Sequence, residues 1–136
     1  MLTGEIHILP TDNTPEFHFN SDGMFKIRGR GLYKNKTEDV EQVLNWITEY
    51  LENPVEVTYV IIAFEYLNSL STVILVSMLR KLKEVILKSK KLVIHWYYEE
   101  DDEDMYERGE YISLTFDIPF TFILTDHISA FLSQSV

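Results

Sequence analysis

The sequence predicts an α/β fold in which helices cover a mixed β-sheet. Three observations support this prediction: a pair of alternating segments joined by a short turn, two long apolar runs typical of buried strands, and amphipathic helical segments between them. The predicted order is β-β-α-β-α-β-α-β, which places strands and helices in alternation after an initial hairpin. The chain has 136 residues and no Gly- or Ser-rich linker, so we expect a single domain over residues 1–136.

The initial hairpin is predicted from residues 14–20 and 24–30. Apolar and polar side chains alternate in both segments, and Ser21-Asp22-Gly23 between them is typical of a turn. Ile6 and Ile8 allow a further short strand before the hairpin. Gly29-Arg30-Gly31 is too short for a phosphate-binding loop, and we expect these glycines to end the second strand.

The first helix is predicted to begin after Asn35, which would cap it with Glu38 as the reciprocal partner. Asn53-Pro54 is expected to end it. One face of this helix is apolar, formed by Val40, Val43, Leu44, Ile47 and Leu51. The apolar run over residues 55–67 follows as a central strand.

A second helix is predicted from about Ser69 to Ser89. At 100° per residue, its core-facing stripe is expected to contain Leu75, Met78, Leu79, Leu82, Val85 and Ile86. Residues 92–98 then form a second buried strand, in which His95 is expected to be a hydrogen-bonded structural residue.

The last part of the chain is predicted to contain a short helix, a strand and a terminal helix or tail. Six acidic residues occupy positions 99–104, and acids at the start of a helix interact favourably with its dipole. Residues 119–124 are the predicted last strand, and residues 127–133 the terminal helix or tail.

Composition excludes several function classes. The formal net charge of −10 disfavours nucleic acid and anionic membrane surfaces as partners. There are no cysteines, which excludes disulfides, thiol catalysis and thiolate zinc sites. The amino terminus has neither a basic start nor a long apolar run, so we predict no signal peptide and a cytoplasmic location.

No motif predicts catalysis, a metal or a cofactor. The four histidines are scattered along the sequence and lack the helical spacing of a metal site. The acidic run lacks the alternating acids and turn glycine of a calcium loop, so we expect it to be exposed and to bind no metal tightly. No arrangement indicates a nucleophile triad. The interpretation is a non-enzymatic protein, with an enzyme that uses the acidic cluster as a remaining alternative.

The junction between the strand over residues 55–67 and the second helix is the most informative segment. Asn68, Ser69 or Ser71 could simply cap the helix. Alternatively, one hydroxyl lies exposed at the helix N-terminus, where backbone N–H groups would accept a phosphate.

The face of this helix opposite the core stripe carries Val73 and Val76, with Ser69, Ser77 and Arg80 beside them. Isolated exposed valines are common on protein surfaces. Together with a phosphorylatable hydroxyl, they could instead form the centre of a docking surface.

The sequence resembles the SiaC-type regulatory phosphoproteins, which have a STAS-like fold related to the anti-sigma-factor antagonists. The resemblance extends from about residue 6 to residue 124. It is carried by the succession of Thr14-Pro15, Asn35, Asn45-Trp46-Ile47, Tyr66-Leu67-Asn68-Ser69, His95-Trp96-Tyr97-Tyr98-Glu99 and Asp117-Ile118-Pro119-Phe120.

The resemblance implies a phosphorylation-controlled partner switch. In this family a threonine at the helix start is phosphorylated by a dedicated protein kinase and dephosphorylated by a PP2C-type phosphatase. The unmodified protein binds and activates a diguanylate cyclase, which raises cyclic di-GMP and favours biofilm formation or aggregation. The matching position here is Ser69, a departure from threonine that keeps the hydroxyl, and Leu70 and Val73 also replace smaller or polar residues.

The sequence therefore predicts phosphorylation of Ser69 and a partner-binding surface at Asn68, Ser69, Thr72, Val73, Val76 and Arg80. No metal or other cofactor is expected. The alternative function is a small-molecule or nucleotide-binding STAS-like sensor domain.

Overall fold

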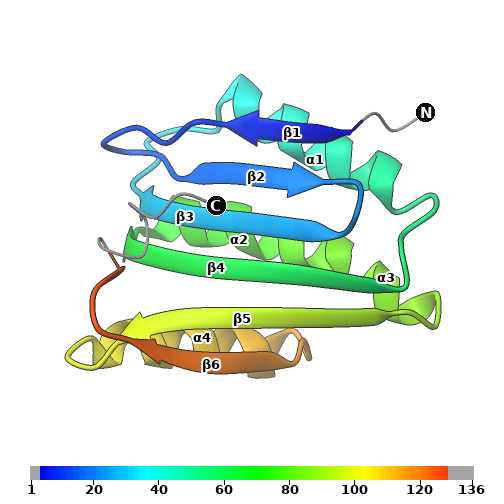
Figure 1. Ribbon diagram of the computed structural model, residues 1–136. Helices are drawn as coiled ribbons and strands as arrows, with labels where there is room; N and C mark the ends of the chain where they lie inside the picture. Colours follow the sequence, from blue (N-terminus) through cyan, green and yellow to red (C-terminus); the bar gives the residue numbers. More distant parts are fainter. Residues whose placement is uncertain (1–3, 129–136) are drawn as a thin grey trace.

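The computed structural model describes residues 4–128, which contain one six-stranded sheet and the helices that pack on it (Figure 1). The strands lie in the sheet in sequence order. Their bounds are Glu5–Ile8 (β1), Glu16–Asn20 (β2), Met24–Gly31 (β3), Val57–Leu67 (β4), Lys91–Glu99 (β5) and Phe120–Thr125 (β6). The helices are Glu38–Tyr50 (α1), Ser69–Leu82 (α2), Glu84–Leu87 (α3) and Glu103–Thr115 (α4).

The sheet is mixed, as the sequence predicts. β1, β2 and β3 pair antiparallel, whereas β3, β4, β5 and β6 pair parallel, with crossovers through the helices. The α/β class is therefore confirmed. The short strand that Ile6 and Ile8 allowed is present as β1, so three strands precede the first helix.

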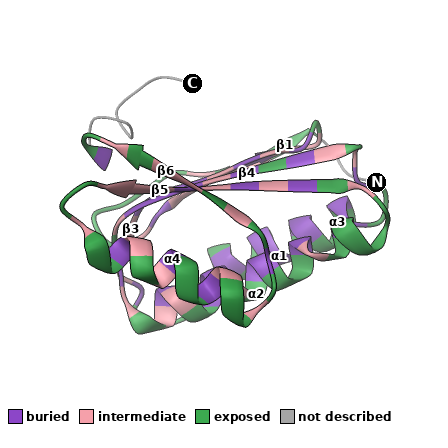
Figure 2. Ribbon diagram, turned by 90° about the horizontal axis from the view of Figure 1, so that it is seen from below, coloured by how far each residue is buried: buried purple, intermediate pink, exposed green. Residues whose placement is uncertain are grey.

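All the helices lie on one face of the sheet, and the opposite face is left without a helical layer among residues 4–128 (Figure 2). We call this second side the uncovered face. The core fills the space between the sheet and the helices, with Phe19 and Phe25 of the sheet packed against Trp46 of α1. Strand alternation sends the remaining side chains of each strand to the uncovered face.

The start of α1 differs from the prediction. The N-cap residue is Thr37, whose side chain makes no capping hydrogen bond, and Glu38 is the first helical residue. The predicted capping role of Asn35 is therefore wrong. Glu38, Asp39 and Glu41 stabilise the first turn through the helix dipole instead, which is why a side-chain cap is dispensable here.

The second helix is shorter than predicted, because α2 ends at Leu82 and the chain continues after Lys83 as the short helix α3. Leu75, Met78, Leu79 and Leu82 are buried as expected. Ile86 lies beyond the break and is 39% exposed, so its assignment to the core stripe is wrong.

Two further expectations concern single positions. The glycine pair lies at the end of β3 as expected: the strand continues through a bulge at Gly29 and Arg30 and ends at Gly31. Gly29 has a φ of 125°, a conformation that side chains disfavour. His95 is half-buried on β5, but its imidazole has no hydrogen-bond partner within residues 4–128, contrary to the predicted structural role.

The predicted helix or tail over residues 127–133 lies mostly outside the described residues. Between residues 4 and 128, no helix has the length and apolar character needed to cross a membrane.

Candidate functional site

The N-terminus of α2 is anchored by Asn68 and Ser71. The Asn68 side chain accepts a hydrogen bond from the Ser71 N–H (2.9 Å) and donates one to the Tyr33 carbonyl oxygen (2.9 Å). The buried Ser71 hydroxyl accepts from the Tyr33 N–H (3.1 Å). Tyr33 is itself buried, and burial together with the nearby Asp39 carboxylate raises its pKa to about 12, so its phenol stays neutral. Hydrogen bonds among the cap residue Asn68, Ser71 in the first turn of α2 and Tyr33 after β3 therefore hold the start of the helix in place.

Ser69, the first residue of α2, is exposed. Within the described part of the chain its hydroxyl has no hydrogen-bond partner, because Asn68 already provides the cap. Thr72 differs, since its hydroxyl donates to the Asn68 carbonyl oxygen (2.9 Å) and the residue is half-buried. Of the two hydroxyls on this side of α2, Ser69 is the one available to another molecule.

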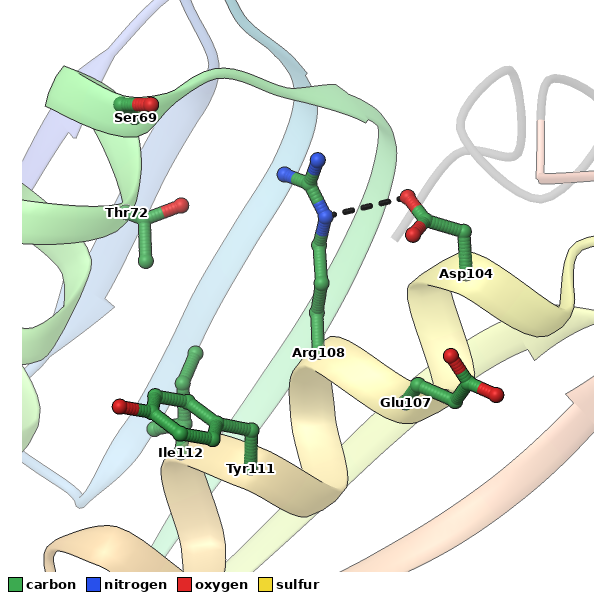
Figure 3. Close-up of a pocket in the computed structure, with 7 residues that line it drawn as sticks. All are labelled: Ser69, Thr72, Asp104, Glu107, Arg108, Tyr111 and Ile112. Carbon is green, nitrogen blue, oxygen red and sulfur yellow. Dashed lines mark hydrogen bonds and ion pairs between the residues drawn. The ribbon is translucent and has the colours of Figure 1, made fainter.

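Ser69 lies on the edge of a pocket of about 460 Å³ between α2 and α4 (Figure 3). A second hollow of about 370 Å³ continues along the same two helices. Both are lined by Thr72, Tyr111 and Ile112. We call the combined depression the α2–α4 groove; it is lined by Ser69, Thr72, Val73, Val76, Ser77, Arg80, Asp104, Glu107, Arg108, Tyr111, Ile112 and Phe116.

The two ends of the groove differ in polarity. The end near Ser69 carries Arg108, whose Nε lies 3.1 Å from an Asp104 carboxylate oxygen and whose Nη1 donates to the Leu67 carbonyl oxygen. Figure 3 shows the Arg108 guanidinium between the Ser69 side of α2 and Asp104. The Arg108 guanidinium thus places a positive charge at the same end of the groove as the Ser69 hydroxyl.

The other end of the groove is apolar. Val73 is 64% exposed and Tyr111 is 67% exposed, which is high for large apolar side chains. Arg80 limits this end, with its guanidinium 5.7 Å from the centre of the Phe116 ring. The sequence placed Val76 on the helix face opposite the core stripe. In the structure Val76 is half-buried and packs against the core, so it forms the floor of the groove.

The structure brings together every residue of the predicted surface. Ser69, Thr72, Val73, Val76 and Arg80 all line the groove, and Asn68 lines a neighbouring depression. The sequence did not predict the side of the groove that α4 forms. A weak signal existed, because Arg108 and Tyr111 are spaced to share one face of a helix, but nothing in the sequence places that face beside α2.

The acidic run over residues 99–104 covers the last residue of β5, the turn after it and the first residues of α4. Asp102 caps this helix by accepting from the Met105 N–H (3.1 Å), and Glu103 and Asp104 occupy the first turn. The expected helix start is confirmed. Glu100, Asp101, Glu103 and Asp104 are exposed, whereas Glu99 and Asp102 are half-buried.

We expect calcium and magnesium to bind this acidic run no more tightly than the millimolar range. One carboxylate is engaged by the helix cap and another by Arg108, and the run lacks the alternating acids and turn glycine that arrange oxygens around calcium. Isothermal titration with each cation measures this, and micromolar affinity for either would contradict the expectation.

The histidines are less scattered than the sequence suggests. His7 and His18 face each other on β1 and β2 beside Glu16, and their potential ligand atoms lie within 4.8 Å of one another. This cluster is on the uncovered face, away from the α2–α4 groove.

Comparison with known proteins identifies relatives of the whole fold. The crystal structure of apo-SiaC from Pseudomonas aeruginosa superposes with a TM-score of 0.76 at 22% identity, covering 90% of this chain and 99% of that one. The SiaC chain in the crystal structure of the diguanylate cyclase SiaD in complex with its activator SiaC, from the same organism, gives a TM-score of 0.77 at 24% identity, again covering 90% and 99%. At such identities the likeness establishes a shared fold. No curated protein matches in sequence.

The family comparison goes further. The SiaC family regulatory phosphoprotein profile matches residues 8–125, which is most of the 136-residue chain and includes the whole α2–α4 groove. This chain belongs to the SiaC family of regulatory phosphoproteins.

Proposed function

We propose that this protein is a non-catalytic partner switch in cyclic di-GMP signalling. When Ser69 is unmodified, the α2–α4 groove binds and activates a diguanylate cyclase, which favours biofilm formation or aggregation. A protein kinase turns binding off by phosphorylating Ser69, and a PP2C-type phosphatase restores it. The observation that carries the proposal is the exposed Ser69 hydroxyl, which has no hydrogen-bond partner among residues 4–128 and lies on the edge of a partly apolar groove.

The position of Ser69 suits phosphorylation without unfolding. It is the first residue of α2, where the free backbone N–H groups and the helix dipole favour negative charge. The cap and the link to Tyr33 depend on Asn68 and Ser71, not on the Ser69 hydroxyl. Arg108 lines the same pocket and can form an ion pair with the phosphate in place of its present ion pair with the exposed Asp104.

The same phosphate opposes a docked partner. It adds about −1.5 to −2 charges at neutral pH to the edge of the groove. A partner that packs over Val73 and Tyr111 would have to bury this charge, and burying an incompletely paired charge costs several kcal/mol. Because about 1.4 kcal/mol corresponds to a tenfold change in affinity, part of this penalty is enough to switch binding off.

The P. aeruginosa complex supports a cyclase as the partner, because its SiaC is described as the activator of the diguanylate cyclase SiaD. The shared family is the reason to extend that partner class to this chain. The kinase and phosphatase rest on the Ser69 site itself and on the family's description as phosphoproteins.

Two substitutions at Ser69 test the switch. We expect Ser69→Ala to bind a GGDEF-domain cyclase from the same genome as tightly as the unmodified protein does. Ser69→Asp should bind at least about tenfold more weakly, because a carboxylate at the groove edge imposes part of the phosphate's penalty. Biolayer interferometry measures both affinities, and cyclic di-GMP production by the cyclase reports activation.

Thr121→Asp is the matched control. It adds the same charge at an exposed position of β6, on the uncovered face, and should leave binding unchanged. If Ser69→Asp binds like Ser69→Ala, and mass spectrometry of protein from cells finds no phosphate on Ser69, the switch is wrong.

The alternative sensor function predicts a different result. A nucleotide or small molecule that fills the groove would stabilise the folded state and raise the melting temperature. A screen of nucleotides by thermal shift measures this, with Tyr111→Ala as the variant that should abolish any such effect.

A further inference from the structure

A cluster of two histidines and a glutamate lies on the uncovered face of the sheet. Phe17 and Phe19 of β2 point into the core, so strand alternation turns Glu16 and His18 to the opposite face. His7 on β1 pairs directly with His18 and points the same way. The register of the first two strands therefore brings together residues that are 9 to 11 positions apart in sequence.

The three side chains present their polar atoms to one another. The imidazoles of His7 and His18 stack with their ring centres 3.9 Å apart. His7 Nε2 lies 2.7 Å from a carboxylate oxygen of Glu16, and His18 Nε2 lies 2.8 Å from one of Glu5. One ligand atom from each of His7, Glu16 and His18 falls within 4.8 Å of the others.

Glu16 is held in place by Arg28, its partner on the neighbouring strand β3. The Arg28 Nε and Nη2 donate to the same Glu16 oxygen, at 2.9 and 2.6 Å, and Arg28 is buried. The second oxygen of Glu16 is thereby directed toward His7. Partial burial alone would raise the pKa of Glu16, but hydrogen bonds from His7 and Arg28 outweigh it and lower the pKa, so the carboxylate is ionised at neutral pH.

We propose that His7, His18 and Glu16 bind a divalent transition metal of the zinc type. Two imidazoles and a carboxylate are a donor set that zinc takes in proteins when a fourth position stays open. Water or the Glu5 carboxylate, which contacts His18, completes the coordination. Imidazole ligands favour zinc, copper and nickel, whereas calcium and magnesium prefer oxygen alone.

Binding requires a small rearrangement of the side chains. Zinc bonds of about 2.0–2.1 Å in a tetrahedron place neighbouring ligand atoms about 3.4 Å apart. His7 Nε2 and the Glu16 oxygen, now 2.7 Å apart, must therefore separate, the ligand atoms that lie up to 4.8 Å apart must approach, and the rings must unstack. Each imidazole must present an unprotonated Nε2 and carry its proton on Nδ1, as metal-bound histidines do. Both histidines are partly exposed, His7 on the edge strand β1 and His18 on β2 beside it, which leaves their side chains free to turn.

The charges around the site are balanced. Glu5 and Glu16 face it from β1 and β2, while Lys26 and Arg28 face it from β3. The added cation is therefore held by direct coordination and not by a general negative field. Affinity should fall as the pH is lowered, because protons compete with a metal ion for its ligand atoms.

Titration with zinc chloride tests the proposal on the full chain without a histidine tag. We expect one site per chain at pH 7.5, a clear loss of affinity at pH 5.5, and at least about tenfold weaker binding for the double variant His7→Ala/His18→Ala. Cobalt(II) should give the visible absorption of a four-coordinate site with the parent protein and not with the variant. In the same titration, followed by isothermal calorimetry, calcium chloride should give no heat of binding.

His95→Ala is the matched control, because His95 lies on the same uncovered face two strands beyond β3 and outside the cluster. It should bind zinc like the parent. The proposal is wrong if the parent protein gives no zinc signal, or if the double variant binds as tightly as the parent. Circular dichroism of each variant verifies the fold, and Ser69-dependent partner binding should be unaffected, since the cluster and the groove lie on opposite faces.

Discussion

Replacing Leu79 by Ala is expected to lower the free energy of unfolding by about 2–5 kcal/mol, the usual cost of emptying a fully buried leucine site. Leu79 lies on the sheet-facing side of α2 and is 0% exposed. Neighbouring core side chains, including Leu75, Met78 and Leu82, are held by the helix and cannot collapse fully into the space. Urea denaturation measures the change as a lower transition midpoint.

Val73→Ala is the control on the same helix. It also removes apolar atoms, but from a side chain that is 64% exposed, so stability should change by no more than about 0.5 kcal/mol. Equal midpoints for Leu79→Ala and the parent would mean that α2 packs with a different face on the sheet.

Gly109→Ala is expected to destabilise the protein by about 1–3 kcal/mol, the typical cost of overpacking a core. A Cβ at Gly109 would lie 2.6 Å from Cε2 and Nε1 of Trp96. Trp96 cannot retreat, because it is buried, stacks on Phe120 and donates a hydrogen bond from Nε1 to the Met105 carbonyl oxygen (3.0 Å). The gain of about 0.5–1 kcal/mol that alanine brings to a helix interior only partly offsets this clash.

Glu110→Ala is the matched control, since Glu110 is the exposed neighbour of Gly109 on α4. Thermal or urea denaturation of both variants measures the difference. A Gly109→Ala protein as stable as the parent would show that α4 can move away from β5. Such a movement would also displace Arg108 and Tyr111, so partner binding of this variant is a second readout of how rigidly the groove is built.

In the proposed switch, the shape of the groove lets the phosphorylation of one residue control a large binding surface. Its polar end holds Ser69 and Arg108, and its apolar end holds Val73 and Tyr111. In the proposed switch, a partner that covers both ends would meet phosphorylated Ser69 directly. The proposed switch needs no change in the fold, because the contacts that anchor α2 do not use the Ser69 hydroxyl.

The local features of this protein follow from the sequence alone. Alternation predicts β2 and β3, apolar runs predict β4 and β5, and helical periodicity identifies four of the residues that α2 buries. The exposed Ser69 at the start of α2 is also predictable, because polar caps precede helices and the apolar stripe fixes which side faces outward. Each of these properties depends on residues that are close together in the chain.

Other features were decided only by tertiary structure. The interruption of the helix at Lys83 turns Ile86 outward. The α4 side of the groove depends on which helices the strand order makes neighbours, and the pairing of His7 with His18 depends on strand register. Periodicity shows which side of an element is apolar, but it carries no information on what lies beside that element. Those neighbours are set by the packing of the whole sheet, which is why the groove wall and the histidine cluster became visible only in the folded protein.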